Sequence, residues 1–249
     1  MTPGTSGGSG PETWLFADAL ARCRIALPLA DNVGRTHDDR DVYHLLDEVA
    51  AGVQAGMEHS RCQRGCDSCC QYPQAFFNVH REEWELIADH VRARWSEDRL
   101  VDFLARFHRS LGRLSRGRLA LAQLLLDLPL PLRPRPTTFL ARCPFLEDHE
   151  CSIYDVRPWK CRAFGWFSYR RIMGGRLDVY ACDEQADALF GPEAGPRLAL
   201  PSATPFHTRI WRLCGGRALS LPRWLLETWP DETPGATSRS RMRAGREVR

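Results

Sequence analysis

The chain contains almost no lysine, no long apolar run and no targeting segment at its start. Lys160 is the one lysine among 34 basic residues. The most apolar stretch, residues 119–132, is broken by polar residues and prolines and is too short to cross a bilayer. The first residues lack the basic and apolar regions of a secretion signal. We therefore expect a cytoplasmic protein without a membrane segment. In that reducing compartment, clustered cysteines bind metals more often than they form disulfides.

Common catalytic and nucleotide-binding motifs are missing as well. The sequence contains no G-x-x-x-x-G-K loop, no G-x-S-x-G elbow and no Rossmann glycine run. No catalytic residue is predicted, and enzymatic activity is left open. The net charge is +3, but the arginines do not alternate with aromatic residues along any segment. Nucleic acid is therefore not an expected partner, and the arginine excess is attributed to codon use in a GC-rich bacterial genome.

The two ends of the chain differ in composition from the middle. Residues 1–11 are mostly Gly, Ser, Pro and Thr, and residues 230–249 combine Pro, Thr and Ser with repeated arginines. Neither end has the apolar residues needed for a core, so we predict a disordered N-terminal tail and a disordered basic C-terminal tail. Hydrophobic residues make up 43% of the whole chain, which is enough for a single globular domain at 12–229.

The periodicity of apolar residues predicts a mainly α fold. Helical spacing is present in five segments: residues 14–27, 42–57, 81–95, 97–107 and 119–126. Ser96 is placed to cap the fourth of these helices. A short strand is expected at 75–79 and a stiff proline-rich connector at 129–136. Two small β-hairpins are predicted at 143–154 and 166–182, so the expected architecture is helix-dominated with small hairpins around a cysteine-rich metal site.

Cysteine is the residue that the sequence clusters most clearly. Eight of the ten cysteines form two blocks: Cys62, Cys66, Cys69 and Cys70, then Cys143, Cys151, Cys161 and Cys182. Thiolates are preferred ligands of soft metals, and close spacing lets one backbone turn present several sulfurs to one centre. Gly65 allows such a turn to be tight. The predicted metal-binding region is therefore about 62–182. Cys23 and Cys214 lie outside both blocks and are not expected to be ligands.

The cysteine spacing favours an iron–sulfur cluster, most simply a four-iron cluster, over zinc. Adjacent side chains on an extended backbone point to opposite sides, so Cys69 and Cys70 suit several metal ions better than one tetrahedral ion. Eight thiols fill either one site with spares or two sites of four. Arg157 and Arg162 flank Cys161. They are candidate cofactor-binding residues, because positive charge would offset a cluster of thiolates.

Four segments resemble the YkgJ-type cysteine-cluster family, which is named for a CxxCxxCC motif and described as putative zinc- or iron-chelating proteins. The segments are Cys66-x2-Cys69-Cys70, Cys143-Pro144-Phe145-Leu146, Cys151-Ser152-Ile153-Tyr154 and Arg157-Pro158-x-x-Cys161-Arg162-x-Phe164. The family pattern has its first cysteine where this chain has Gln63, and Cys62 stands one residue earlier. The resemblance implies a mostly α fold around a metal site. Some relatives resemble flagellin lysine N-methylases, but no catalytic motif of those enzymes is found here.

Two classes of function follow from these features. The first is a redox or cluster-dependent accessory protein that serves a partner protein. The second is a zinc-stabilised structural or interaction module. Methyl transfer and radical S-adenosylmethionine chemistry are weaker alternatives. Cys62-x3-Cys66-x2-Cys69 has the spacing of a radical enzyme, but a predicted helix precedes it and the strand–helix alternation of a barrel is missing.

Overall fold

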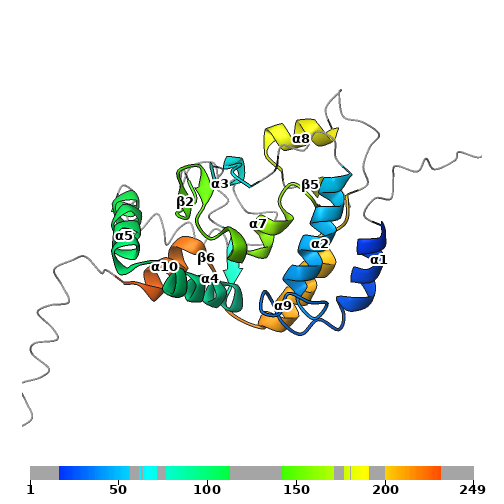
Figure 1. Cartoon of the computed structure of the whole chain (residues 1–249), viewed down its shortest axis with the longest axis horizontal. Coiled ribbons are helices and arrows are strands. Elements are labelled where there is room, and N and C mark those ends of the chain that lie inside the picture. Colours follow the sequence, from blue (N-terminus) through cyan, green and yellow to red (C-terminus); the bar gives the residue numbers. More distant parts are fainter. Residues whose placement is uncertain are drawn as a thin grey trace, which may run out of the picture. The chain divides into compact units, whose positions relative to one another are not determined.

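A computed structural model describes most of the helices and both cysteine blocks. The described residues are 17–56, 62, 64–71, 77–112, 142–170, 177–179, 181–190 and 200–230. They form a helix-dominated structure with three two-stranded antiparallel sheets, as predicted (Figure 1). The helix expected at 119–126, the connector at 129–136 and nearly all of both tails lie outside the described residues. Within the described part, no helix is both long and apolar enough to cross a membrane.

The chain divides into two compact units. The first unit comprises residues 1–69 and 157–215, and the second comprises residues 70–156 and 216–249. The chain passes from one unit to the other three times, and one of these passages lies between Cys69 and Cys70. Each unit therefore contains part of both cysteine blocks.

The first unit is built around helix α2 (Val42–Ala55), which packs against α1 (Ala17–Ala26), α7 (Trp159–Ala163) and α9 (Thr204–Cys214). The apolar face of α2 is buried in this packing: Val42, Tyr43, Leu45, Leu46, Val49, Ala50 and Val53. The unit also contains α8 (Asp183–Phe190) and the antiparallel pair β4 (Ser168–Arg170) and β5 (Leu177–Val179). This pair confirms the second predicted hairpin, although its turn lies outside the described residues.

Asp41 fixes the start of α2. Its carboxylate is fully buried and accepts hydrogen bonds from the backbone N–H groups of Tyr43 at 2.8 Å, Gly34 at 2.7 Å and Thr36 at 3.0 Å. The bond to Tyr43 satisfies an N–H in the first turn of the helix, which has no partner within the helix itself. The bonds to Gly34 and Thr36 hold the preceding loop against the helix. Asp41 thus joins the start of α2 to the loop before it.

The second unit has an aromatic core between its helices. Its elements are β1 (Asn78–His80), α4 (Arg81–Arg94), α5 (Glu97–Gly112), β2 (Leu146–Glu147), β3 (Glu150–Cys151), the 3₁₀ turn η4 (Tyr154–Val156), β6 (Ala218–Ser220) and α10 (Leu221–Thr228). Trp84 of α4 stacks on Trp224 of α10 at 6.0 Å, and Phe103 of α5 stacks on Phe145 at 5.2 Å. The indole N–H of Trp224 donates to the Val79 carbonyl at 2.9 Å, so the ring is buried without losing its hydrogen bond.

Several local predictions are confirmed in the second unit. Helix α4 confirms the helix predicted at 81–95 and buries Trp84, Ile87, Ala88 and Val91. Ser96 caps α5, because its hydroxyl accepts a hydrogen bond from the Arg99 N–H at 3.3 Å. Strands β2 and β3 form the first predicted hairpin, with Asp148 and His149 at positive φ in its turn. Strand β1 pairs with β6 and begins later than expected, at Asn78.

Candidate metal centre

Four thiols of the first unit lie close enough for their charges to interact, and they are called the first thiol group here: Cys62, Cys66, Cys69 and Cys182. Burial raises the pKa of the Cys62 thiol to about 12, and charge on Cys69, Cys66 and Cys182 acts in the same direction. Arg157 acts in the opposite direction. The fold of this unit therefore brings Cys182, from the second sequence block, to three cysteines of the first block.

Gln185 holds this arrangement in place. Its side chain is fully buried in α8, one turn after Cys182. The Cys62 backbone N–H donates to Oε1 of Gln185 at 3.3 Å, and Nε2 of Gln185 donates to the Gly165 carbonyl at 3.4 Å. One amide thus joins the loop that carries Cys62 to the turn that follows α7. Because both ends of the amide are used, the buried side chain is satisfied without a formal charge.

Two glycines shape the backbone near these thiols. Gly165 has φ +83, and a Cβ added to it would lie 3.3 Å from Cγ of Gln185 and 3.5 Å from Sγ of Cys62. The missing side chain therefore leaves room for the Cys62 thiol as well as permitting the backbone conformation. Gly65 has φ +91 in the turn between Cys62 and Cys66, with nothing within 4 Å of such a Cβ. This agrees with the tight turn expected at Gly65.

The backbone around the adjacent cysteines differs from the prediction. Cys69 and Cys70 lie in a short helix, α3 (Ser68–Gln71), and not on an extended strand. Consecutive side chains on a helix are rotated by about 100° around its axis, so the two thiols still diverge. The boundary between the two units falls between these residues. The divergence that the sequence predicted is present, but helical geometry produces it.

Three cysteines of the second unit are linked by their backbones and are called the second thiol group here: Cys70, Cys143 and Cys151. The Cys143 N–H donates to the Cys70 carbonyl at 2.7 Å. The Cys143 carbonyl accepts from the Leu146 N–H at 3.2 Å, and Leu146 is the strand partner of Cys151 in the β2–β3 pair. All three cysteines are half-buried, and Cys143 and Cys151 pack against the apolar core of this unit.

The two arginines proposed as cofactor-binding residues have different surroundings. Arg157 lies near enough to Cys62 to lower the pKa of that thiol. Arg162 is buried beside Cys161 on α7, where its Nε–H donates to the Arg157 carbonyl at 2.9 Å. Its guanidinium also pairs with Asp47 and lies 4.3 Å from the ring centre of Tyr43. These contacts join α7 to α2, a structural role that the sequence reasoning missed.

The sulfur spacing limits what these thiols can bind as they stand. Among the described residues, no three cysteine sulfurs lie within 4.8 Å of one another. Four thiolates around one zinc ion at about 2.3 Å would be separated by about 3.8 Å in a tetrahedron. In an iron–sulfur cluster each thiolate binds a different iron, so the sulfurs are farther apart. The described thiols are therefore grouped but are not closed around one tetrahedral ion.

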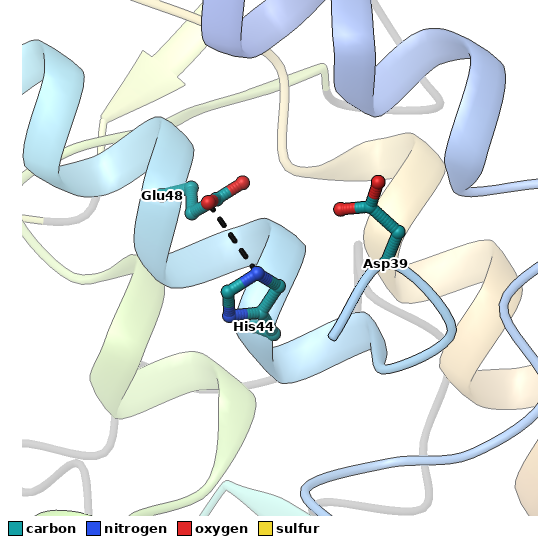
Figure 2. Close-up of side chains that lie close together, drawn as sticks. All are labelled: Asp39, His44 and Glu48. Atoms are coloured by element: carbon teal, nitrogen blue, oxygen red, sulfur yellow. Dashed lines mark ion pairs between the residues drawn. The ribbon is translucent and has the colours of Figure 1, made fainter. Parts of the chain in front are cut away.

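A different set of potential ligands lies on α2 and the loop before it. Asp39, His44 and Glu48 have ligand atoms within 4.8 Å of one another, and Figure 2 shows that the side chains of His44 and Glu48 come from the same helix. Nε2 of His44 is 3.3 Å from Oε1 of Glu48. Arg22 pairs with Glu48 and is 3.7 Å from Asp39. The positive charge that these carboxylates need is thus already supplied by an arginine.

The remaining candidates occupy ordinary structural positions. Cys23 and Cys214 are buried in the first unit, and burial raises the pKa of the Cys23 thiol to about 11. Both are placed as core residues, as expected for cysteines outside the two blocks. His149 is exposed in the β2–β3 turn at φ +65.

Comparison of the chain with models of known protein families, with curated proteins and with solved structures found no match. The resemblance to the YkgJ-type cysteine-cluster family therefore rests on the cysteines and their flanking residues, and it stays a prediction. The argument for function depends on the geometry of the two thiol groups.

Proposed function

We propose that this chain is a metal-binding protein of the YkgJ-type cysteine-cluster kind, which holds an iron–sulfur cluster and acts as a redox or cluster-dependent accessory protein. One observation carries the proposal, namely the first thiol group of Cys62, Cys66, Cys69 and Cys182 in the first unit. Four thiolates are the full ligand set of a four-iron cluster. Gln185 and Gly165 contact the segment that carries Cys62, and residues that contact metal ligands in this way commonly help to orient them.

The electrostatics of Cys62 argues against a free reactive thiolate at this group. With a pKa of about 12, Cys62 is protonated at neutral pH when no cation is bound. Nucleophilic and redox-active cysteines have the opposite property, a lowered pKa that maintains a thiolate. A bound metal ion supplies the positive charge that allows several neighbouring thiols to lose their protons together. Arg157 would offset part of the remaining negative charge.

The adjacent cysteines favour a multinuclear centre over a single zinc ion. The side chains of Cys69 and Cys70 leave α3 about 100° apart, so the two thiols suit different metal ions better than one tetrahedral ion. A radical S-adenosylmethionine enzyme is less well supported. The sheets in the described part are two-stranded and antiparallel, unlike the parallel sheet of a barrel.

Anaerobic purification followed by a visible spectrum and analysis for iron, acid-labile sulfide and zinc tests the proposal. We expect a brown protein with iron and sulfide in equal amounts. Cys62→Ser should lower the iron content, while Cys23→Ser, a matched change of a buried cysteine in the same unit, should leave it unchanged. A colourless protein with stoichiometric zinc and no sulfide would reject the redox role and support the zinc-stabilised module. A protein that binds neither metal would reject both.

A further inference from the structure

We infer that the adjacent residues Cys69 and Cys70 serve two different metal centres, one held by the first thiol group and one by the second. The second thiol group, Cys70, Cys143 and Cys151, then supplies the thiolates of the other centre. This inference rests on the proposed function, because it assigns the thiols of the same metal-binding region to their centres.

The first step is the backbone contact between the members of the second thiol group. The 2.7 Å hydrogen bond from the Cys143 N–H to the Cys70 carbonyl brings these two backbones together. The Cys143 carbonyl is bonded to Leu146, and Leu146 faces Cys151 across the hairpin. Opposed residues of an antiparallel pair have Cα atoms about 4.5–5.5 Å apart. Three cysteines that are distant in sequence thus lie on neighbouring backbone segments within one unit.

The second step is the geometry of α3. Cys69 belongs to the first unit and Cys70 to the second, and their side chains leave the helix about 100° apart. Cys69 lies near Cys62, because charge on Cys69 raises the pKa of the Cys62 thiol. The Cys70 carbonyl is bonded to Cys143. Two centres explain why the sequence has two adjacent cysteines, since each thiol then has neighbours of its own.

The third step is the number of thiols available. The second unit, residues 70–156 and 216–249, contains three cysteines, and these are the members of the second thiol group. The first unit contains the four members of the first thiol group together with Cys161 and the buried residues Cys23 and Cys214. Each centre therefore has at least three thiols within its own unit.

The number of metal ions per chain tests the inference on the unaltered protein. Two four-iron clusters give about eight irons and eight sulfides per chain, whereas one gives about four of each. Cys69→Ser and Cys70→Ser should each remove about half of the iron, and the double variant should remove nearly all of it. The double variant Cys62→Ser with Cys69→Ser should lose no more than either single variant, because both residues belong to one group.

About four irons per chain, or complete loss of iron in both Cys69→Ser and Cys70→Ser, would overturn the two-centre assignment while leaving the proposed function intact. Gel filtration and the far-ultraviolet circular dichroism of each variant, with Cys23→Ser as the control, separate loss of ligand from loss of fold.

Discussion

Replacing Gly165 by alanine tests whether the backbone behind Cys62 supports metal binding. The φ of +83 is unfavourable for a residue with a side chain, and the change should lower the free energy of unfolding by about 1–2 kcal/mol on this ground alone. The new methyl group would also lie 3.3 Å from Cγ of Gln185 and 3.5 Å from Sγ of Cys62. The first distance is tight, so Gln185 has to shift by a few tenths of an ångström.

A displacement of Gln185 is expected to weaken metal binding at the proposed centre. The amide of Gln185 is bonded to the Cys62 N–H at 3.3 Å and to the Gly165 carbonyl at 3.4 Å, and neither bond has length to spare. Loss of residues that orient metal ligands typically lowers metal affinity by about 10–100-fold. We expect Gly165→Ala to release iron to a chelator about tenfold faster than the unaltered protein under anaerobic conditions. The assay follows the decay of visible absorption after the chelator is added.

Gly215→Ala is the matched control. Gly215 also has a positive φ, +44, at the end of α9 in the same unit, but a Cβ there has nothing within 4 Å. The Gly215→Ala variant should show a similar decrease in the free energy of unfolding in urea, and it should release iron at the rate of the unaltered protein. Equal release rates in the two variants, or an unchanged rate in Gly165→Ala, would show that the contact with Cys62 and Gln185 does not support the metal.

Three further predictions use other contacts of the first unit. Gln185→Leu leaves the Cys62 N–H and the Gly165 carbonyl without their hydrogen bonds to the amide. This change should lower the free energy of unfolding in urea by about 2 kcal/mol. Asp187→Ala, a change at an exposed residue of the same helix, is the control and should have little effect. Arg162→Met should reduce stability by about 2 kcal/mol and leave the reduction potential unchanged, while Arg157→Met should lower the potential, because it removes positive charge near the thiols. If the reduction potential falls in Arg162→Met and not in Arg157→Met, then Arg162 and not Arg157 is the residue whose charge acts on the metal centre. Burial raises the pKa of Cys23 to about 11, so its contribution to stability is complete below about pH 8.5 and is lost as the pH rises toward 11. Cys23→Ala should flatten this fall in urea titrations of the metal-free protein, and an equally steep fall in the variant would contradict the assignment.

The sequence predicted the elements whose signals are local. Helix α4 was predictable because apolar residues at Trp84, Ile87, Ala88 and Val91 repeat with the period of a helix. The β2–β3 hairpin was predictable from a polar turn between two apolar segments. The helix α3 was not, since four residues are too few to show a period, and the extended backbone expected at Cys69 and Cys70 was wrong.

The support of the candidate site could not be predicted, because it depends on contacts between distant parts of the chain. Gln185 looks like an ordinary helical residue in the sequence, and its role is visible only when Cys62 and Gly165 lie beside it. Gly165 offered a weak signal, because a glycine between Phe164 and Trp166 is unusual in an otherwise apolar segment. The division of the thiols between two units also has no local signature, because the boundary separates adjacent residues.

The choice of a neutral amide at Gln185 shows how the charge of the first thiol group is balanced. A carboxylate there could accept the Cys62 N–H, but it could not donate to Gly165 and would add negative charge beside several thiols. The amide forms both bonds and leaves the charge balance to Arg157 and to whatever cation the thiols bind. Each thiol that loses its proton to a metal then replaces repulsion from its neighbours with attraction to a shared cation. Under the proposed function, the free energy of metal binding becomes part of the folding free energy of the unit, and metal removal should destabilise it more than the loss of any one hydrogen bond described above.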